Sequence, residues 1–364
     1  MKRIVCFHLF NDYSGSPKVL RMVLEGMLKK GYRVDLVSSK CGVLDELLHY
    51  KNLKKHSYQY KFSNNPVVTM MRYTWVQLYT FFVALRWMFC KDVVFYINTL
   101  LPVGPALAGR MMGKRVVYHY HENAFVKGAF YKVLATMMER LAHSIICVSE
   151  YQASFLNCRE KVTVIPNALP EAFVIRLKPD PEAAFGRKTV LMLGSLKEYK
   201  GTKEFIQLSQ WMKQYRFVLV INDTQENIDK YLKKKGYTRG ENIALYSRQE
   251  DVAKFYQQAS VVLNLSDRRL CIETFGLTAL EAMTAGLPVI VPTEGGIAEM
   301  IDDGVNGYKI DVTNLKRIEH VLMELLSDKT RYIQMADNAL YRAKQFNADD
   351  MIEGVERVLV ANSK

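Results

Sequence analysis

The sequence predicts an α/β protein made of two doubly wound, Rossmann-like domains. At 364 residues the chain exceeds one average domain of about 100 to 200 residues, so two separate cores are expected. Short apolar runs alternate with helical patterns, which is typical of parallel sheets joined by helical crossovers. The alternation stops at a proline-containing segment and then starts again, and this restart indicates the second domain.

The first series contains six apolar runs that we expect to be strands. They are RIVCFHLF, RVDLVSS, DVVFYIN, RVVYHYH, SIICVS and VTVIPN, all within residues 1–172. The second series contains TVLMLGS, RFVLVIN, NIALYS, VVLNLS and PVIVPT, all within residues 189–345. Ligands of such folds bind at the carboxyl ends of the strands, and a cleft between two facing domains is the expected site.

The boundaries follow from the same pattern. Residues 1–172 form the predicted N-terminal domain and residues 189–345 the C-terminal domain. Residues 173–188 lie in the stretch PEAFVIRLKPDPEAAFGRK, which has three prolines and no periodicity, and we expect them to be a linker. Residues 346–364 are expected to form a C-terminal helix that returns to the N-terminal domain.

Charge is distributed unevenly along the chain. Residues 1–178 hold 25 Lys and Arg against 11 Asp and Glu, whereas the remainder holds 25 against 26. The first half is therefore expected to meet an anionic partner, such as a membrane surface or a phosphate-bearing acceptor. Nucleic acid is not expected, because the chain has no RNP, zinc-finger or helix-turn-helix signature.

Cysteines and the apolar segments bear on location. The six cysteines are scattered without a CxxC pair, which favours reduced thiols and no metal site. The N-terminal run MKRIVCFHLF is expected to be a strand rather than a signal peptide. The longest uncharged run in the apolar stretch 66–98 is Tyr73 to Leu85, 13 residues, too short to span a bilayer. We expect a buried or interfacial helix there, and a cytoplasmic protein attached peripherally to the inner face of the membrane.

The segment CIETFGLTALEAMTAGLPVIVPTEGG is the most specific part of the chain. Glu273 and Glu281 are eight residues apart, and Thr274, Phe275 and Gly276 are expected to turn from a strand into a helix. Free amides at a helix start, with the helix dipole behind them, bind anions. If the helix begins at Thr274, that residue and Glu281 share one helix face.

This segment closely resembles the donor-binding motif of family 4 glycosyltransferases. The resemblance implies the GT-B fold, in which two Rossmann-like domains face each other across a cleft. It implies that Glu273 contacts hydroxyls of the donor sugar and that Glu281 contacts the ribose. The amides of Phe275, Gly276 and Leu277, with Thr274, would lie near the diphosphate of a nucleotide sugar.

The string LMLGSLKEYKGTKEFI carries a second part of the resemblance. Lys200 matches the lysine that holds the donor diphosphate, and an ammonium there would stabilise the charge that develops on the leaving phosphate. The family usually has an arginine after the first glycine of this element, Gly194, and here that position is Ser195. Lys197, Arg268 and Arg269 are candidates to supply the missing charge.

The first domain has matching features. Gly15, in NDYSGSPKVL, stands where the family has a glycine-rich loop near the donor. In VVYHYHEN, His121 and Glu122 resemble the histidine and acid that approach the donor sugar and the acceptor. His119 points the same way in a strand of period two, so it is a second acceptor-side candidate.

Family 4 enzymes are retaining, and the resemblance implies front-face transfer, in which the departing phosphate helps to take the acceptor proton. Lys200, Glu273 and His121 are the expected catalytic residues. The sequence contains no DxD triplet, so we expect metal-independent chemistry and no cofactor besides the nucleotide sugar, which is a substrate. The expected acceptor is a glycan or a lipid-linked saccharide, as in the synthesis of capsule, exopolysaccharide or lipopolysaccharide.

Two other functions fit the same motifs. A nucleotide-sugar 2-epimerase of similar fold would share the donor site but need no acceptor surface. A non-catalytic partner that only binds nucleotide sugars is the other alternative, because Ser195 departs from the family pattern.

Overall fold

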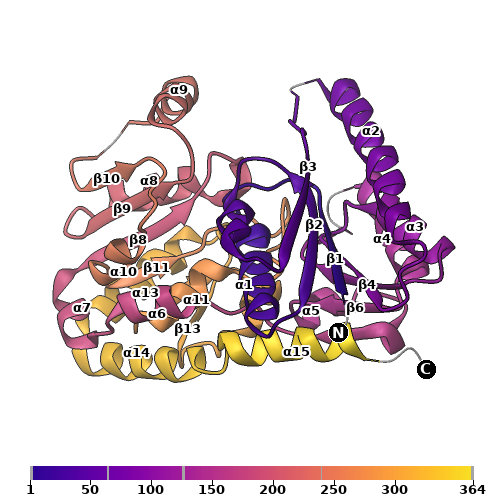
Figure 1. Cartoon of the computed structure of the whole chain (residues 1–364). Coiled ribbons are helices and arrows are strands. Elements are labelled where there is room, and N and C mark those ends of the chain that lie inside the picture. Colours follow the sequence, from indigo (N-terminus) through magenta and orange to yellow (C-terminus); the bar gives the residue numbers. More distant parts are fainter. Residues whose placement is uncertain (1–2, 64, 125–127, 239, 362–364) are drawn as a thin grey trace. The chain divides into compact units, whose positions relative to one another are not determined.

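The chain folds into two compact units in the computed structural model, which describes residues 3–63, 65–124, 128–238 and 240–361 (Figure 1). Unit 1 comprises residues 1–167 and 348–364, and unit 2 comprises residues 168–347. Each unit has its own parallel sheet with helical crossovers, which confirms the predicted α/β class.

The sheet of unit 1 has seven strands within the described residues, in the order β3-β2-β1-β4-β5-β6-β7. All of its neighbouring strands pair in parallel. The strands are β1 (Arg3–His8), β2 (Arg33–Ser39), β3 (Leu53–Tyr58), β4 (Val93–Asn98), β5 (Arg115–Tyr120), β6 (Ser144–Cys147) and β7 (Val162–Val164).

Helices connect these strands. They are α1 (Gly15–Lys29), η1 (Val43–His49), α2 (Pro66–Ala84), η2 (Leu85–Trp87), α3 (Val103–Met111), α4 (Ala129–Leu141), α5 (Glu150–Ala153), η3 (Arg159–Lys161) and α15 (Ala348–Val360). The central strands read as apolar runs because both faces of the sheet are covered. The core includes Phe7, whose ring centroid lies 5.1 Å from that of Phe95 and 6.3 Å from that of Trp87.

Unit 2 repeats this plan with six strands within the described residues, in the order β10-β9-β8-β11-β12-β13. The strands are β8 (Thr189–Gly194), β9 (Arg216–Ile221), β10 (Ile243–Tyr246), β11 (Val261–Leu263), β12 (Val289–Val291) and β13 (Gly307–Lys309). The helices are α6 (Glu171–Leu177), α7 (Pro181–Arg187), η4 (Glu198–Lys200), α8 (Thr202–Trp211), α9 (Gln225–Lys235), α10 (Ala253–Gln257), α11 (Leu277–Thr284), α12 (Gly296–Glu299), α13 (Leu315–Ser327) and α14 (Lys329–Ala343).

Both strand orders contain a topological switch point, where the direction of winding reverses. In unit 1 it lies between β1 and β4, and in unit 2 between β8 and β11. The crevice at the carboxyl ends of these two strands is where open α/β sheets bind their ligands. Each unit therefore has one preferred place for a ligand.

The segment expected to be a linker is folded. Residues 173–188 contribute to α6 and α7, which group with unit 2. Asp180 caps α7 by accepting a hydrogen bond from the amide of Ala183 at 3.0 Å, and Pro181 occupies the first helical position. The prolines therefore start a short helix rather than an irregular connection.

The C-terminal helix α15 (yellow in Figure 1) belongs to unit 1. It packs against α1 so closely that a Cβ on Gly26 would lie 2.7 Å from the side chain of Ile352. Glu356 accepts a hydrogen bond from the Tyr32 hydroxyl at 2.8 Å and pairs with Lys30. These contacts attach the end of the chain to the first domain.

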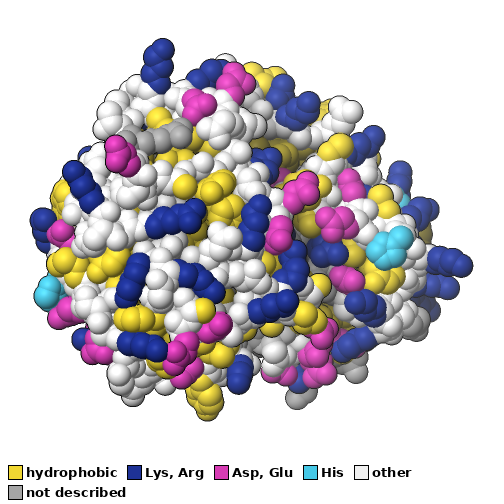
Figure 2. Space-filling view, turned by 90° about the vertical axis from the view of Figure 1, so that its left-hand side faces the viewer, with side chains coloured by type: hydrophobic (Ala, Val, Ile, Leu, Met, Phe, Trp, Pro, Cys, Tyr) yellow, Lys and Arg dark blue, Asp and Glu magenta, His cyan; other side chains and the backbone are white. Residues whose placement is uncertain are grey.

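The net charge of each structural unit differs from that of each half of the sequence, because α15 belongs to unit 1. Unit 1 holds 25 Lys and Arg against 14 Asp and Glu, a net charge of +11, whereas unit 2 holds 25 against 23. The excess remains in unit 1 even though α15 adds acidic residues to it. Figure 2 shows a face on which basic and acidic side chains are interspersed and hydrophobic side chains form separate areas, an ordinary pattern for a protein surface.

The cysteines and the apolar stretch can now be placed. All six cysteines are free thiols, but Cys41 is exposed and does not lie in the core. None of the helices in the described residues is long and apolar enough to cross a membrane. The stretch that starts at Pro66 forms α2, which is buried on one face only.

Candidate active site

The switch point of unit 2 holds a compact charged cluster. Lys200, at the end of η4, forms an ion pair with the Oε1 atom of Glu273, and the Ser266 hydroxyl donates to the same oxygen at 2.9 Å. Lys200 comes from the loop after β8, and the other two residues come from the segment after β11. Two residues that are 73 positions apart in the sequence thus meet where a ligand is expected.

Lys200 is held in its charged form. Burial lowers the pKa of this ammonium, but the charge and hydrogen bond of Glu273 outweigh burial, so the pKa of Lys200 is raised overall. The side chain remains 26% exposed, so an incoming anion can reach it. The cluster therefore provides a permanent positive charge beside a carboxylate.

The helix after Glu273 begins later than expected. The backbone of Gly276 has φ of 90°, and α11 starts at Leu277. Thr274 lies outside the helix, so our expectation that it shares a helix face with Glu281 is wrong. The reason is the left-handed turn at Gly276, which a side chain would obstruct because a Cβ there would lie 2.5 Å from Ile297.

A second glycine turn supports Glu273 from behind. The amide of Gly296 donates to the carbonyl oxygen of Glu273 at 2.9 Å. A Cβ on Gly295, whose φ is 110°, would lie 2.5 Å from the same oxygen. The GG pair of the motif thus allows the loop after β12 to approach Glu273 closely. Phe275, in contrast, is buried and its ring packs against that of Phe346.

Glu281 lies on α11 and is oriented by a tyrosine. The Tyr256 hydroxyl, from α10, donates to its Oε2 atom. Burial and then the neighbouring Glu281 charge raise the pKa of Tyr256 well above its usual value, so the phenol stays protonated and remains a donor. This bond fixes the carboxylate of Glu281, which is half-buried on α11.

The loop between β8 and α8 carries Lys200 in a fixed conformation. Gly201 has φ of 73°, and a Cβ there would lie 2.4 Å from Leu265, so only glycine fits. The carbonyl oxygen of Gly194 accepts a hydrogen bond from the amide of Asn222 at 2.9 Å. Ser195 is half-buried, and its carbonyl lies 3.4 Å from the Thr202 hydroxyl.

The three candidates for the missing arginine differ in their partners. Arg268 pairs with Glu294 and Asp311, and Arg269 pairs with Asp267. Lys197 is exposed, lies in the same loop as Ser195 and takes part in none of the ion pairs between described residues. Its ammonium lies 5.7 Å from the centroid of the Tyr199 ring, and that of Lys200 lies 5.5 Å from it. Of the three candidates, Lys197 is thus the one that has no ion pair within the described residues.

The switch point of unit 1 holds a chain of neutral polar groups. His8 ends β1, Asn98 ends β4 and His121 follows β5. The distance from Phe10 O to His8 Nε2 is 2.9 Å, from His8 Nδ1 to Asn98 Nδ2 3.0 Å, and from Asn98 Oδ1 to His121 Nε2 3.1 Å. Three strand ends are thus connected by one line of hydrogen bonds.

The direction of this chain follows from its first member. The carbonyl oxygen of Phe10 only accepts, so His8 Nε2 carries a proton. Burial lowers the pKa of His8 to about 4, so its ring is neutral near pH 7 and Nδ1 accepts from Asn98. The Asn98 oxygen then accepts from His121 Nε2, which fixes the tautomer of His121.

The acceptor-side roles of His119 and Glu122 stay predictions, and both side chains have partners within unit 1. His119 is completely buried, with Nδ1 2.6 Å from the Tyr96 hydroxyl, and its ring stacks against that of His121 at 4.2 Å. Its side chain projects from β5 onto a covered face of the sheet, beside the ring of His121. Glu122 accepts a hydrogen bond from the amide of Leu100 at 3.0 Å and holds the loop after β4. Burial lowers the pKa of His119 to about 3.

Gly15 is the first residue of α1, at the carboxyl end of β1. It is exposed, as a residue that approaches a ligand must be. The preceding turn is held by Asp12, which accepts from the amide of Ser14 at 3.0 Å and from its hydroxyl at 2.6 Å.

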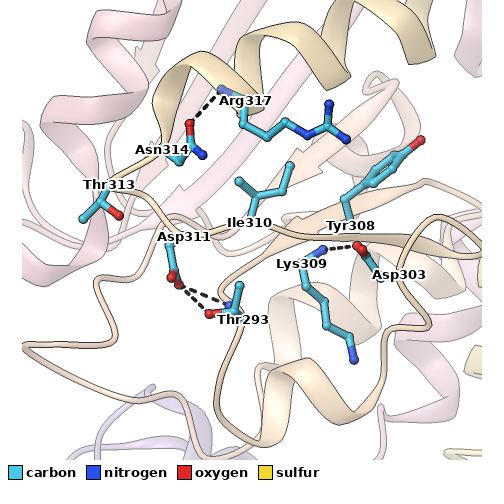
Figure 3. A pocket seen from close by; sticks show the side chains of 9 residues that line it. All are labelled: Thr293, Asp303, Tyr308, Lys309, Ile310, Asp311, Thr313, Asn314 and Arg317. Atoms are coloured by element: carbon cyan, nitrogen blue, oxygen red, sulfur yellow. Dashed lines mark hydrogen bonds between the residues drawn. The ribbon is translucent and has the colours of Figure 1, made fainter.

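A separate hollow of about 340 Å³ lies in unit 2 beside the ends of β12 and β13 (Figure 3). Its polar groups already bind each other: Asp311 accepts from the Thr293 hydroxyl, and Asp303 accepts from the amide of Lys309. It contains none of the predicted site residues, so we do not assign the site to it. Within the described residues, no three His, Cys, Asp or Glu side chains are grouped to hold a metal ion.

Four polar residues of these clusters were not predicted from the sequence. They are His8, Asn98, Ser266 and Tyr256. Asn98 was detectable, because it closes the apolar run DVVFYIN, which the switch-point rule places at the ligand crevice. His8 stands inside the run RIVCFHLF, and the structure shows that β1 ends there. Ser266 and Tyr256 had no such signal, since only the fold brings them to the two glutamates.

Comparison with known families assigns both halves of the chain. The family described as Glycosyl transferases group 1 matches residues 176–345, and Glycosyltransferase Family 4 matches residues 13–173. An uncharacterized glycosyltransferase of Methanocaldococcus jannaschii is 25% identical over 238 residues, which are 64% of this chain and 63% of the relative. A D-inositol 3-phosphate glycosyltransferase of Corynebacterium kroppenstedtii is 36% identical over 98 residues, 27% of this chain and 21% of the relative. The matches thus span less than two thirds of these curated relatives.

Solved structures share the fold over the whole chain. HepE of Anabaena, crystallised with UDP-glucose, superposes with a TM-score of 0.76 at 18% identity and covers 98% of this chain and 99% of its own. WaaG, a glycosyltransferase involved in lipopolysaccharide biosynthesis, superposes with a TM-score of 0.71 at 17% identity over 99% and 100%. The fold is accordingly GT-B, and the chain belongs to the family 4 glycosyltransferases, whose two sequence families match its two halves in order.

Proposed function

We propose that this protein transfers a sugar from a nucleotide diphosphate sugar to a glycan or lipid-linked saccharide acceptor, with retention of anomeric configuration. The observation that carries the proposal is the cluster of Lys200, Glu273 and Ser266 at the switch point of unit 2. An ammonium and a carboxylate side by side suit a donor that presents a diphosphate and sugar hydroxyls to the same place. The solved neighbour crystallised with UDP-glucose supports a donor of this class.

Lys200 has two roles in this proposal. Before the donor binds, it pairs with Glu273 and keeps that carboxylate in position. When the diphosphate arrives, its charge competes for the ammonium, and Glu273 becomes available to accept hydrogen bonds from sugar hydroxyls. Lys200 then stabilises the charge that grows on the phosphate as the glycosidic bond breaks. Lys197 would add a second positive charge in place of the arginine that is Ser195 here.

The nucleoside end of the donor is assigned to α11. Glu281 is oriented by Tyr256 and would accept hydrogen bonds from ribose hydroxyls. Gly276 caps α11 without any side-chain oxygen, so the amides of the first turn can face an anion. In this proposal, α11 binds the diphosphate at its first turn and the ribose through Glu281 on its side.

The proton and the sugar are handled together in a front-face transfer. The acceptor hydroxyl attacks the anomeric carbon from the side of the departing phosphate, and that phosphate takes the hydroxyl proton. Such a reaction asks the protein for positioning and charge stabilisation rather than for a separate base. His121, with its tautomer set by Asn98, is the residue of unit 1 proposed to contact the donor sugar.

We propose that the reaction needs no divalent metal, because the sequence has no DxD triplet and Lys200 supplies a positive charge for the leaving phosphate. We also propose that the protein works at the inner face of a membrane, in the synthesis of a surface polysaccharide or lipopolysaccharide. The net charge of +11 on unit 1 supports a membrane or acceptor that is anionic.

The test is a panel of UDP-, GDP- and ADP-sugars, incubated with the protein with and without a glycolipid extract of the native membrane. Release of nucleoside diphosphate that depends on the extract, with an α-linked product from an α-linked donor, is the expected result. A change of the donor sugar without extract would instead identify the 2-epimerase. Donor binding without release or conversion would identify a non-catalytic binding partner.

A further inference from the structure

Helix α2 exposes a stripe of large apolar side chains. Met71, Trp75, Leu78 and Phe82 are 68%, 71%, 52% and 64% exposed. Their spacing of four, three and four residues places them on one face of the helix. We call these four residues the α2 stripe.

The opposite face of α2 is packed, so the stripe cannot rotate inward. Val76, Thr80 and Val83 are buried in the core of unit 1. A Cβ on Gly104 of α3 would lie 2.1 Å from the carbonyl oxygen of Gln77, and this glycine allows the two helices to touch. The start of α2 is also fixed, because Asn65 accepts a hydrogen bond from the amide of Val67 at 2.9 Å.

The apolar surface continues beyond the stripe. Phe89, two residues after η2, is 93% exposed. On α3, exposed Leu107 and Met111 follow Gly104 by three and seven residues, so they lie on the side of α3 that faces α2. An apolar surface of this extent is rare on a soluble monomer and marks an interaction site.

Charges around the stripe identify the kind of partner. Residues 60–112 contain one acidic residue, Asp92, whereas their basic residues are Lys61, Arg72, Arg86, Lys91 and Arg110. Lys61, Arg72, Arg86 and Lys91 are all exposed and take part in none of the ion pairs between described residues. The surface thus combines large apolar side chains with uncompensated positive charge.

We infer that α2 lies flat on an anionic lipid bilayer, with the α2 stripe inserted among the acyl chains and the basic residues on the head groups. Tryptophan and phenylalanine with flanking Lys and Arg are what an interfacial helix requires. At 19 residues and 1.5 Å per residue, α2 offers about 28 Å of such surface. This inference deepens the membrane part of the proposed function, but it rests on α2 and not on the donor site.

A second copy of the chain fits the same surface less well. Two stripes that face each other would bring Arg72 and Arg86 of both copies together, and Asp92 is the one acidic residue in the segment 60–112 of each copy. An anionic bilayer neutralises these residues and also accepts Phe89. The charge pattern therefore favours lipid over self-association.

The first experiment measures co-sedimentation with vesicles of phosphatidylcholine alone or with 30% phosphatidylglycerol. We expect wild type to bind the anionic vesicles at least tenfold more strongly and to be released in part by high salt. The variant Trp75→Ser/Phe82→Ser should bind anionic vesicles at least tenfold more weakly. Arg72→Glu/Arg86→Glu should lose the preference for anionic lipid. The matched control is Tyr341→Ser, because Tyr341 on α14 of unit 2 is also 71% exposed and should not affect binding.

The second experiment follows the tryptophan itself. Vesicle binding should shift the emission of wild type to the blue. Trp75→Phe should bind without that shift, since Trp87 is buried in the core and Trp211 lies on α8 of unit 2, outside the α2 stripe. Stripe variants that bind vesicles as wild type does would overturn the inference. So would a concentration-dependent dimer of wild type that the stripe variants convert to monomer. Binding of UDP in solution, measured in parallel, keeps a failure here distinct from a failure of the proposed donor site.

Discussion

Unit 1 and unit 2 place their polar groups at the same topological position but use opposite chemistry. In unit 2, the switch point holds an ion pair between Lys200 and Glu273. In unit 1, it holds a line of neutral groups from His8 through Asn98 to His121. The strand order determines where a ligand binds, whereas the residues at the strand ends determine what that ligand is.

Burial accounts for the difference in charge. His8 and His119 are shut inside unit 1, and burial lowers the pKa of each far below 6.5. Burial also lowers the pKa of His121 well below its usual value, and the neighbouring histidines add to this effect. Lys200 instead has a carboxylate within reach, which outweighs burial. The switch point of unit 1 is therefore lined by neutral groups, and that of unit 2 by charged ones.

The largest effect on activity is expected when the positive charge at the switch point of unit 2 is removed. Lys200→Ala should lower kcat by about 100-fold, because removal of one preorganised group at a developing charge costs about 2.7 to 4 kcal/mol of transition-state stabilisation. The measurement is release of nucleoside diphosphate at saturating donor. Lys203→Ala is the matched control, since Lys203 is exposed on α8 three residues away and should keep full activity. Activity of Lys200→Ala within twofold of wild type would remove the phosphate role.

A smaller effect on activity is expected when the hydrogen bond that orients His121 in unit 1 is removed. Asn98→Ala breaks the line of hydrogen bonds, so His121 loses its fixed tautomer, and kcat should fall by about tenfold (about 1.4 kcal/mol). Affinity for nucleoside diphosphate should stay within twofold, because that ligand is assigned to unit 2. Nitrogen-15 NMR of the histidine rings should show His121 protonated at Nε2 in wild type and as a mixture in the variant.

The control for this variant is Asn52→Ala. Asn52 also bridges two groups of unit 1, the carbonyls of Leu28 and Tyr32, but it is not part of the line of hydrogen bonds from His8 to His121. It tests for a general loss of stability. The positioning role of Asn98 is wrong if both variants lose the same activity. It is also wrong if Asn98→Ala lowers the affinity for nucleoside diphosphate instead of kcat.

Acid should destabilise unit 1 more than unit 2. The unfolded chain binds protons on its histidines near pH 6.5, but folded His8 does so only near pH 4. The unfolded state therefore binds more protons between these values, and the stability that is present above pH 6.5 is lost as the pH falls toward 4. Each such histidine contributes up to about 1.4 kcal/mol per pH unit. Unit 2 has a single histidine, the exposed His320, and lacks this term.

Hydrogen exchange at pH 7 and pH 5, corrected for the intrinsic rates, measures this difference. Peptides from β1, β4 and β5 should lose more protection in acid than peptides from β8 and β11. His8→Gln should reduce the loss in unit 1, whereas His49→Gln, which changes an exposed histidine, should not. Equal losses in both units would show that buried histidines do not control acid stability.

The smallest effect is expected from metal removal. Activity in excess EDTA should remain within twofold of the untreated value, because Lys200 is proposed to supply a positive charge at the leaving phosphate. The assay is nucleoside diphosphate release with a purified acceptor. A loss that magnesium or manganese restores would replace the metal-free mechanism.

Much of the fold was predictable from apolar patterning, and two strands were not. The segments of β3 (Leu53–Tyr58) and β13 (Gly307–Lys309) were not predicted, because these two edge strands lack a long apolar run. β3 contains two lysines and a histidine, since an edge strand does not need the apolar run of a central strand. The helices α6 and α7 in the segment 173–188 were not predicted either, because helices of seven residues are too short to show a period.

Site residues that stand within a sequence motif were predictable. Site residues that only the fold brings together were not. The Glu273 motif and Lys200 stand in recognisable strings, and the structure brings the two residues together. The start of α11 was placed three residues early, because the left-handed turn at Gly276 is a backbone property that the letters alone do not reveal. The partners His8 and Asn98 come from strands 90 positions apart, and only the strand order makes them neighbours.

The most direct test of the donor site in unit 2 is calorimetric titration with UDP, GDP and ADP of wild type, Glu281→Gln and Glu273→Gln. We expect wild type to bind at least one of these nucleotides, Glu281→Gln to bind it about tenfold more weakly through loss of the ribose contact, and Glu273→Gln to bind it within about twofold of wild type, because Glu273 is assigned to the sugar that these nucleotides lack. Equal loss of affinity in both variants, or no binding by wild type, would contradict the account.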